Sequence, residues 1–143
     1  MSRFWLLLLA VGGVVLADLA FWATRRGETT PPATVEVRGA PSLKVDVKKI
    51  GLGNIHLGEW VSASFTLTNV GDQPLRFTGE PFIEVAEGCR PPTPTIGSMA
   101  LDPGESTTLS MEFMMHGDMG GMHDFRVHVP NNDPAQPERV MTV

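Results

Sequence analysis

The sequence predicts an all-β domain, a sandwich of about seven strands, preceded by one N-terminal transmembrane helix. Three observations lead to this prediction. Apolar and polar residues alternate in short runs from residue 43 onward, Gly (15) and Pro (12) are abundant among 143 residues, and no segment after residue 26 has the periodicity of an amphipathic helix. Short alternating runs that are separated by turn residues are typical of an immunoglobulin-like β-sandwich.

The alternation is clearest where Val61, Ala63, Phe65 and Leu67 alternate with serine and threonine. Because successive side chains of a strand point to opposite faces, each such run has one buried face and one solvent-facing one. The same pattern predicts strands at residues 43–48, 61–68, 75–77, 82–85, 109–115, 125–129 and 138–143. The Asn-Val-Gly-Asp sequence at 69–72 predicts a turn.

Residues 1–26 are predicted to be a membrane anchor. The stretch from Phe4 to Trp22 contains a single charged residue, Asp18. At about 1.5 Å per residue, a helix of this length spans the roughly 30 Å hydrocarbon core of a bilayer. Aromatic pairs at both ends of the stretch are typical of the two membrane interfaces. A signal peptide that is cleaved before Asp18 is the alternative that the sequence leaves open.

Residues 27–42 are rich in Pro, Thr and Gly, which predicts an extended linker between the anchor and a domain at 43–143. The distribution of positive charge does not decide the orientation, because Arg3 precedes the apolar stretch and Arg25 and Arg26 follow it. We expect a single-pass protein of the cell membrane with an extracytoplasmic domain, for the chemical reason given below.

The charge of the part after the anchor argues against nucleic-acid binding. Residues 27–143 contain 8 basic and 15 acidic side chains, a net charge of −7, whereas nucleic-acid binding requires a basic surface. A single cysteine gives neither an intrachain disulfide nor a zinc site made of cysteines alone. No phosphate-binding loop, nucleophile elbow or zinc-protease motif occurs, so we expect no enzymatic activity.

Methionine and histidine are concentrated between residues 111 and 123. Five of the eight methionines fall in this segment, where an even distribution would place fewer than one. Thioether sulfur selects Cu(I) and imidazole also suits copper, whereas zinc does not favour thioethers. The sequence therefore predicts a Cu(I) site whose candidate ligands are Met114, Met115, His116, Met119, Met122, His123 and Cys89. Thioethers do not protonate, and oxidising extracytoplasmic compartments hold few free thiols, so this ligand set favours an extracytoplasmic location.

We predict that the methionine-rich segment is a β-hairpin with its turn at 117–121. In the favoured register the facing pairs are His116–Met122, Phe113–Phe125, Met111–Val127 and Glu112–Arg126. The candidate ligands then gather at the tip, where Asp124 is placed to orient a histidine.

Several candidate ligands also have an ordinary structural explanation. Core packing explains Met111, and it explains Met115 as well as ligation does. An adaptable contact surface is the alternative for the other three methionines of the segment. Cys89 is either a ligand or a free thiol tucked under its loop, and the sequence does not determine whether this loop lies at the same end as the hairpin.

Four motifs occur in a characteristic order along the domain. They are the stretch Ile55–Leu75, Gly88-Cys89, Leu101-Asp102-Pro103-Gly104-Glu105 and Asn132-Asp133-Pro134. In this order they resemble the bacterial DUF1573 family, one of the ASH and MSP-type immunoglobulin-like domains. The resemblance implies a sandwich of seven or eight strands, an exported protein and no enzymatic activity. The family often has Cys-Gly-Cys where this chain has Glu87-Gly88-Cys89, so the resemblance implies no paired-thiol role here.

Two functions of different classes follow from these observations. The first is a membrane-anchored copper-binding protein that captures, buffers or delivers Cu(I) to a membrane-bound acceptor. The second is a non-catalytic immunoglobulin-like module that docks on another envelope protein through its methionine-rich tip.

Overall fold

The computed structural model describes residues 31–88, 92–117 and 120–143, and the chain divides into two compact units, Met1–Pro31 and Pro32–Val143. The predicted anchor at 1–26 lies outside the described residues. Among the residues that are described, no helix is long and apolar enough to cross a membrane. The described residues of the second unit form nine strands: β1 (Leu43–Val45), β2 (Trp60–Asn69), β3 (Leu75–Arg76), β4 (Phe82–Glu87), β5 (Thr95–Ile96), β6 (Ala100–Leu101), β7 (Ser106–Met114), β8 (Asp124–Pro130) and β9 (Glu138–Thr142).

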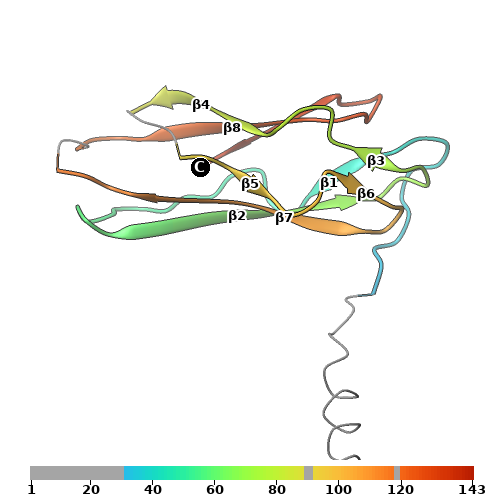
Figure 1. The fold of residues 1–143 in the computed structure, drawn as a ribbon, viewed down its shortest axis with the longest axis horizontal. Coiled ribbons are helices and arrows are strands. Elements are labelled where there is room, and N and C mark those ends of the chain that lie inside the picture. Colours follow the sequence, from blue (N-terminus) through green and yellow to red (C-terminus); the bar gives the residue numbers. More distant parts are fainter. Residues whose placement is uncertain (1–30, 89–91, 118–119) are drawn as a thin grey trace, which may run out of the picture. The chain divides into compact units, whose positions relative to one another are not determined.

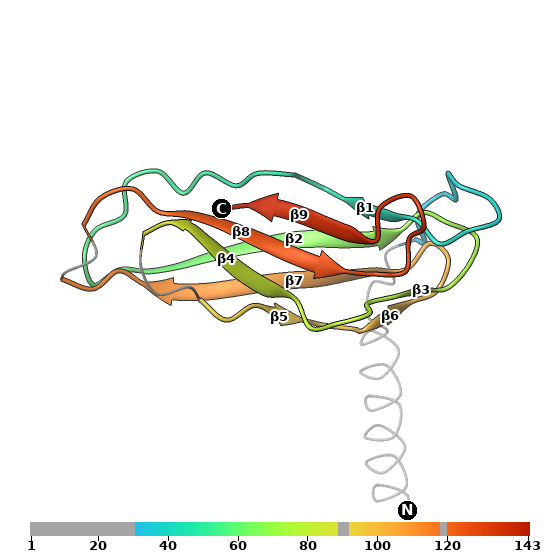
Figure 2. The same ribbon diagram turned by 90° about the horizontal axis from the view of Figure 1, so that it is seen from above.

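The strands form two main sheets that are stacked as two layers (Figure 1). One sheet has the order β1-β2-β7-β5 and the other the order β4-β8-β9, while β3 and β6 form a two-stranded ribbon. Figure 2 shows the β4-β8-β9 sheet lying over the longer sheet. The core between the sheets includes Phe65, Leu109 and Val127, which are completely buried. The expected all-β, immunoglobulin-like architecture is confirmed.

The longest ladder of the sandwich joins β2 to β7 and shows why this sequence forms strands. In β2, Ala63, Phe65 and Leu67 are buried, whereas the serine and threonine residues between them face outward. The period of two therefore gives one apolar face, and that face covers the core. The seven predicted strands are present, and β5 and β6, of two residues each, are additional.

The end of the sandwich that carries the turns at 69–74, 102–105 and 131–137, here named the closed end, is held by buried amide and carboxylate side chains. The Asn69 side chain accepts a hydrogen bond from the Gly71 amide (2.9 Å) and donates to the carbonyls of Gln73 (2.8 Å) and Leu101 (3.1 Å). A buried amide that satisfies several backbone groups fixes the turns around it.

A second buried side chain ties the start of β1 to the turn at 131–137 at the closed end. The Asp133 carboxylate accepts hydrogen bonds from the backbone amides of Leu43 (3.0 Å) and Ala135 (2.9 Å), and its own amide donates to the Asn131 side chain (2.9 Å). The asparagine and aspartate motifs that carry the family resemblance are therefore structural in this chain.

Part of the segment that was predicted to be a linker is hydrogen-bonded to the closed end. The Ala33 amide donates to the Gly104 carbonyl (2.9 Å), and the amides of Glu36 and Val37 both donate to the Val70 carbonyl (2.7 and 3.0 Å). The chain thus joins the sandwich at its closed end.

Candidate functional site

The segment between β7 and β8 is not a hairpin, and the predicted register is wrong. β7 pairs with β2 on one edge and with β5 on the other, whereas β8 pairs with β4 and β9. β7 and β8 therefore belong to different sheets, and within the described residues they do not pair with each other. The chain that connects them passes from one sheet to the other (Figure 1).

Two of the predicted pairs show the cause of this error. Phe113 and Phe125 do meet, with ring centroids 5.7 Å apart and planes at 75°, but they meet across the core. Glu112 faces a residue of β2, and Arg126 lies 3.7 Å from the carboxylate of Glu84 on β4. The two phenylalanines face the core, so they would meet both in a hairpin and in two stacked sheets. The predicted pairing of Glu112 with Arg126 could form only in a hairpin.

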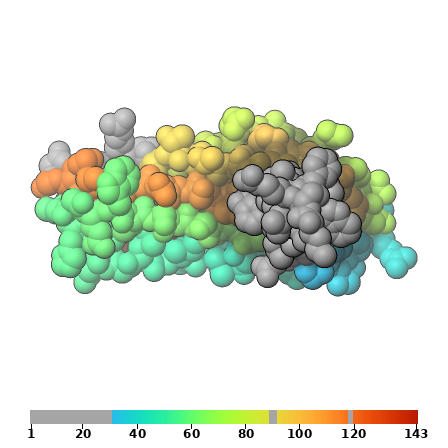
Figure 3. All heavy atoms as spheres, turned by 60° about the horizontal axis from the view of Figure 1, so that its bottom comes forward, coloured from blue at the N-terminus to red at the C-terminus, as the bar shows by residue number. Residues whose placement is uncertain are grey.

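The methionine-rich segment lies at the end of the sandwich opposite the turns described above, here named the open end. The loop between β1 and β2, the end of β4 and the segment after β7 come together there (Figure 2). The Gly58 amide of the β1–β2 loop donates to the Met115 carbonyl (2.6 Å). Trp60 begins β2 opposite Met114, the last residue of β7, and these two strand ends lie side by side on the face in Figure 3.

A groove of about 820 Å³ opens at this end. Its walls come from residues 49–57, from the segment 113–125 and from Thr142 and Val143 at the end of β9. Among the described residues that line it, the apolar side chains are Ile50, Leu52, Ile55, Leu57, Phe113, Met115, Met122, Phe125 and Val143. The groove is therefore a largely apolar concavity with a few polar groups, which is the usual form of a ligand site.

The structure brings three of the seven candidate ligands to this groove. Met115, which is buried, Met122, which is 70% exposed, and the half-buried His123 all line it. Met114 and His116 are not among the lining residues. The two remaining candidates, Met119 and Cys89, lie outside the described residues. Met111 packs in the core at 2% exposure, as expected.

His123 is held closely against the end of β4. Its Nδ1 lies 3.3 Å from the Gly121 carbonyl oxygen, and its ring lies 6.0 Å from that of Phe125, centroid to centroid. A Cβ at Gly88 would overlap the His123 ring, and Gly88 also has a φ of +109°. Glycine is therefore required next to this histidine, both for space and for backbone conformation.

Asp124 contributes a carboxylate to the groove that is not fully satisfied. Its Oδ1 atom is buried and has no hydrogen-bond partner among the described residues. Within residues 31–88, 92–117 and 120–143, no group of three His, Cys, Asp or Glu side chains is arranged to hold a metal ion. Besides His123 and Asp124, the described residues that line the groove offer the sulfur atoms of Met115 and Met122 as possible donors.

The wall at residues 49–57 is a part of the site that sequence reasoning missed. Its apolar residues Ile50, Leu52, Ile55 and Leu57 lie between glycines in a segment without regular secondary structure. Four large aliphatic residues in a loop are the signal that predicts such a wall, because a fully solvated loop does not need them.

Comparisons with known proteins give the family of the domain. A model of the HYDIN/CFA65/VesB-like Ig-like domain matches residues 41–143. No curated protein matches the chain.

Two solved structures are similar to the chain at 15% sequence identity. One is the secreted serine protease VesC from Vibrio cholerae, with a TM-score of 0.50 over 72% of this chain. The match covers 22% of the VesC chain, so the likeness concerns about a fifth of that protein's length. The other is the ASH / PapD-like domain of human CEP192 (PapD-like domain 7), with a TM-score of 0.42 over 82% of this chain and 85% of that one.

The family match agrees with the expected immunoglobulin-like class, without singling out the DUF1573 family. Because the matching model covers more than half of the sequence, the chain belongs to the HYDIN/CFA65/VesB-like Ig-like domain family.

Proposed function

We propose that this protein is a membrane-anchored, extracytoplasmic copper-binding protein whose open end captures Cu(I) and passes it to a membrane-bound acceptor. The observation that supports the proposal is the shared groove, which Met115, Met122 and His123 line together. Two thioethers and an imidazole are a soft and uncharged ligand set of the kind that suits Cu(I). We propose no catalytic activity.

The Met115 and Met122 side chains are expected to differ in mobility, and this difference is consistent with a site that captures a copper ion and releases it again. Met115 is 7% exposed and so is fixed in the groove wall, whereas Met122 is 70% exposed. An unbranched methionine side chain has three rotatable bonds, so Met122 can turn toward an ion that Met115 and His123 already contact. Met119 and Cys89 remain candidates for further donors.

The position of the groove also fits delivery to a partner. The chain joins the sandwich at the closed end, and β2 spans the distance between the two ends, from Trp60 at the open end to Asn69 at the closed end. Ten residues of extended strand span roughly 30 Å, at about 3.3 Å per residue. The sequence that precedes the domain therefore enters it at the closed end, and the groove lies at the other end of β2. A membrane tether raises the effective concentration of the site toward an acceptor in the same membrane.

A competition titration tests the copper site. The full chain in neutral detergent is titrated with Cu(I) without oxygen, against a chromogenic Cu(I) chelator. We expect tight binding of one ion, and a loss of at least about tenfold in affinity when Met115→Leu, Met122→Leu and His123→Gln are combined. Leucine preserves the apolar volume, so the fold is retained while sulfur is removed.

Met99→Leu is the matched control, because Met99 is also surface-exposed (37%) but does not line the groove. This variant is expected to bind Cu(I) as the unmodified chain does. Equal affinity of the triple variant and the control would refute the copper proposal.

A second function, docking on another envelope protein, is favoured by a different observation. Leu57 (58% exposed), Trp60 (67%) and Met122 (70%) are all large apolar residues at the open end. Exposed apolar clusters of this kind mark interaction surfaces. In affinity capture from envelope extracts, a partner that is retained in excess Cu(I) chelator and lost with Trp60→Ser would favour this function over copper delivery.

A further inference from the structure

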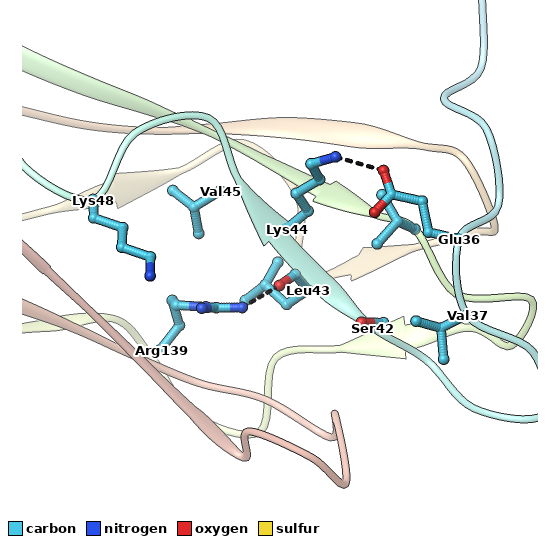
Figure 4. A pocket seen from close by; sticks show the side chains of 9 residues that line it. Glu36, Val37, Ser42, Leu43, Lys44, Val45, Lys48 and Arg139 are labelled. Carbon is cyan, nitrogen blue, oxygen red and sulfur yellow. Dashed lines mark hydrogen bonds and ion pairs between the residues drawn. The ribbon is translucent and has the colours of Figure 1, made fainter.

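A second pocket, separate from the open-end groove, lies on the side of the sandwich where strand β1 meets strand β9. It has a volume of about 280 Å³, and Figure 4 shows the side chains that surround it. Its charged lining residues are Glu36, Lys44, Lys48 and Arg139. Three cations and one carboxylate leave this pocket with a net charge of +2, on a domain whose net charge is −7.

Two of these cations have no carboxylate to neutralise them. Glu36 forms its ion pair with Lys44. No carboxylate of the described residues lies within ion-pair distance of Lys48 or Arg139. In Figure 4 the Lys48 ammonium and the Arg139 guanidinium both point into the space beside Val45. Two like charges facing one small space repel each other, and an anion between them relieves that repulsion.

The framework holds the Arg139 guanidinium and the backbone of Lys48 in position. An Nη2–H of Arg139 donates to the Leu43 carbonyl (2.5 Å), and the Arg139 Nε is buried without a partner among the described residues. The Lys48 carbonyl accepts a hydrogen bond from the Thr142 amide (3.0 Å), which fixes this part of the loop to β9. Because the guanidinium is already ordered, a ligand that binds it loses little side-chain entropy in doing so.

We propose that this pocket binds a phosphate group, through Lys48 and Arg139. A guanidinium fork together with an ammonium is the usual recognition set for phosphate oxygens, and the small volume suits a single such group. The phosphate is either free in solution or part of a lipid headgroup. The site is independent of the copper proposal, because its charged residues are not part of the open-end groove.

The test follows the backbone amides of Leu43 and Lys48 and the Arg139 side chain by NMR, using the full chain in neutral detergent. Sodium phosphate is titrated in at constant ionic strength, with chloride as the balancing anion. We expect saturable shifts of these signals, and at least about fivefold weaker binding in Lys48→Gln. Arg76→Gln removes an exposed cation elsewhere on the domain and is expected to leave binding unchanged.

A second arm distinguishes the sources of phosphate. The chain is placed in nanodiscs of phosphatidylglycerol or in bilayers that display no phosphate headgroup, both without free phosphate. Shifts of the same signals with phosphatidylglycerol assign the site to lipid headgroups, and shifts with free phosphate alone assign it to a soluble ligand. Signals that fail to saturate in both arms, or binding that Lys48→Gln leaves unchanged, would overturn the proposal.

Discussion

The two ends of the sandwich differ in how their loops are held. At the closed end, the side chains of Asn69 and Asp133 are almost completely buried and each bonds to several backbone groups. At the open end, loops surround a groove of about 820 Å³, and Leu57 and Met122 are more than half exposed. The comparison indicates that the closed end fixes the fold, while the open end is free to carry a ligand or partner.

The largest expected contrast between the ends comes from two glycines. A Cβ at Gly71 would overlap the Ala40 carbonyl oxygen and lie 2.6 Å from the Ser42 nitrogen, whereas one at Gly117 meets nothing within 4 Å. We expect Gly71→Ala to lower the free energy of unfolding by about 3 kcal/mol, because rigid backbone must move. Gly117→Ala should change it by less than about 1 kcal/mol. Urea unfolding followed by the amide signals of β2 measures both, and equal losses would contradict the comparison.

The next effect concerns the buried carboxylate of the closed end. Asp133→Ala removes the acceptor of the Leu43 and Ala135 amides and should lower the free energy of unfolding by about 2 kcal/mol. Asp102→Ala, an exposed aspartate at the same end, serves as the control and should cost less than about 0.5 kcal/mol. If both variants unfold at the same urea concentration, the bonds to Asp133 do not stabilise this end.

A smaller loss of stability is expected from a substitution at Gly88, which lies against His123 at the open end. Gly88→Ala should cost about 1–2 kcal/mol, from the strain of its positive φ and from overlap with the His123 ring. In a His123→Ala background only the strain remains, so the same change should cost about 1 kcal/mol less. A double-mutant cycle by urea unfolding measures this coupling. Strictly additive changes would show that the two residues do not press on each other in solution.

The smallest effect on stability is expected at Met122. Because its side chain is 70% exposed, Met122→Leu should change the free energy of unfolding by less than about 0.5 kcal/mol. The same substitution is expected to weaken Cu(I) binding, since it removes one of the three proposed ligands. A loss of stability without a loss of copper affinity would assign Met122 to packing instead.

The strands were predictable because alternation is a local property of the sequence. The pattern of Ala63, Phe65 and Leu67 determines which face of β2 is buried, whatever strand lies beside it. The Asn-Val-Gly-Asp turn was predictable for the same reason. β5 and β6 were not, because two residues are too few to show a period.

The pairing of β7 and β8 was not predictable from the same information. Alternation shows that Phe113 and Phe125 face the core, but it does not say which strand occupies each edge. The β2 residues that pair with β7 lie 38 to 54 positions earlier in the chain, far outside any local pattern. The groove depends on that long-range pairing and on the loop at 49–57, so the sequence identifies candidate ligands by residue type but does not give their arrangement.

The hydrogen bonds of residues 33–37 to the closed end affect where the folded unit begins. The family match starts at residue 41, whereas the compact unit starts at Pro32. A fragment that begins at residue 41 would lack Glu36 and Val37, whose backbone amides donate hydrogen bonds to the Val70 carbonyl. It would also lack the residues that cover Val70, which is buried in the full domain. Recombinant work on the isolated domain should therefore retain the sequence from Pro32, since the nine residues that precede the family match form part of the outer layer of the domain.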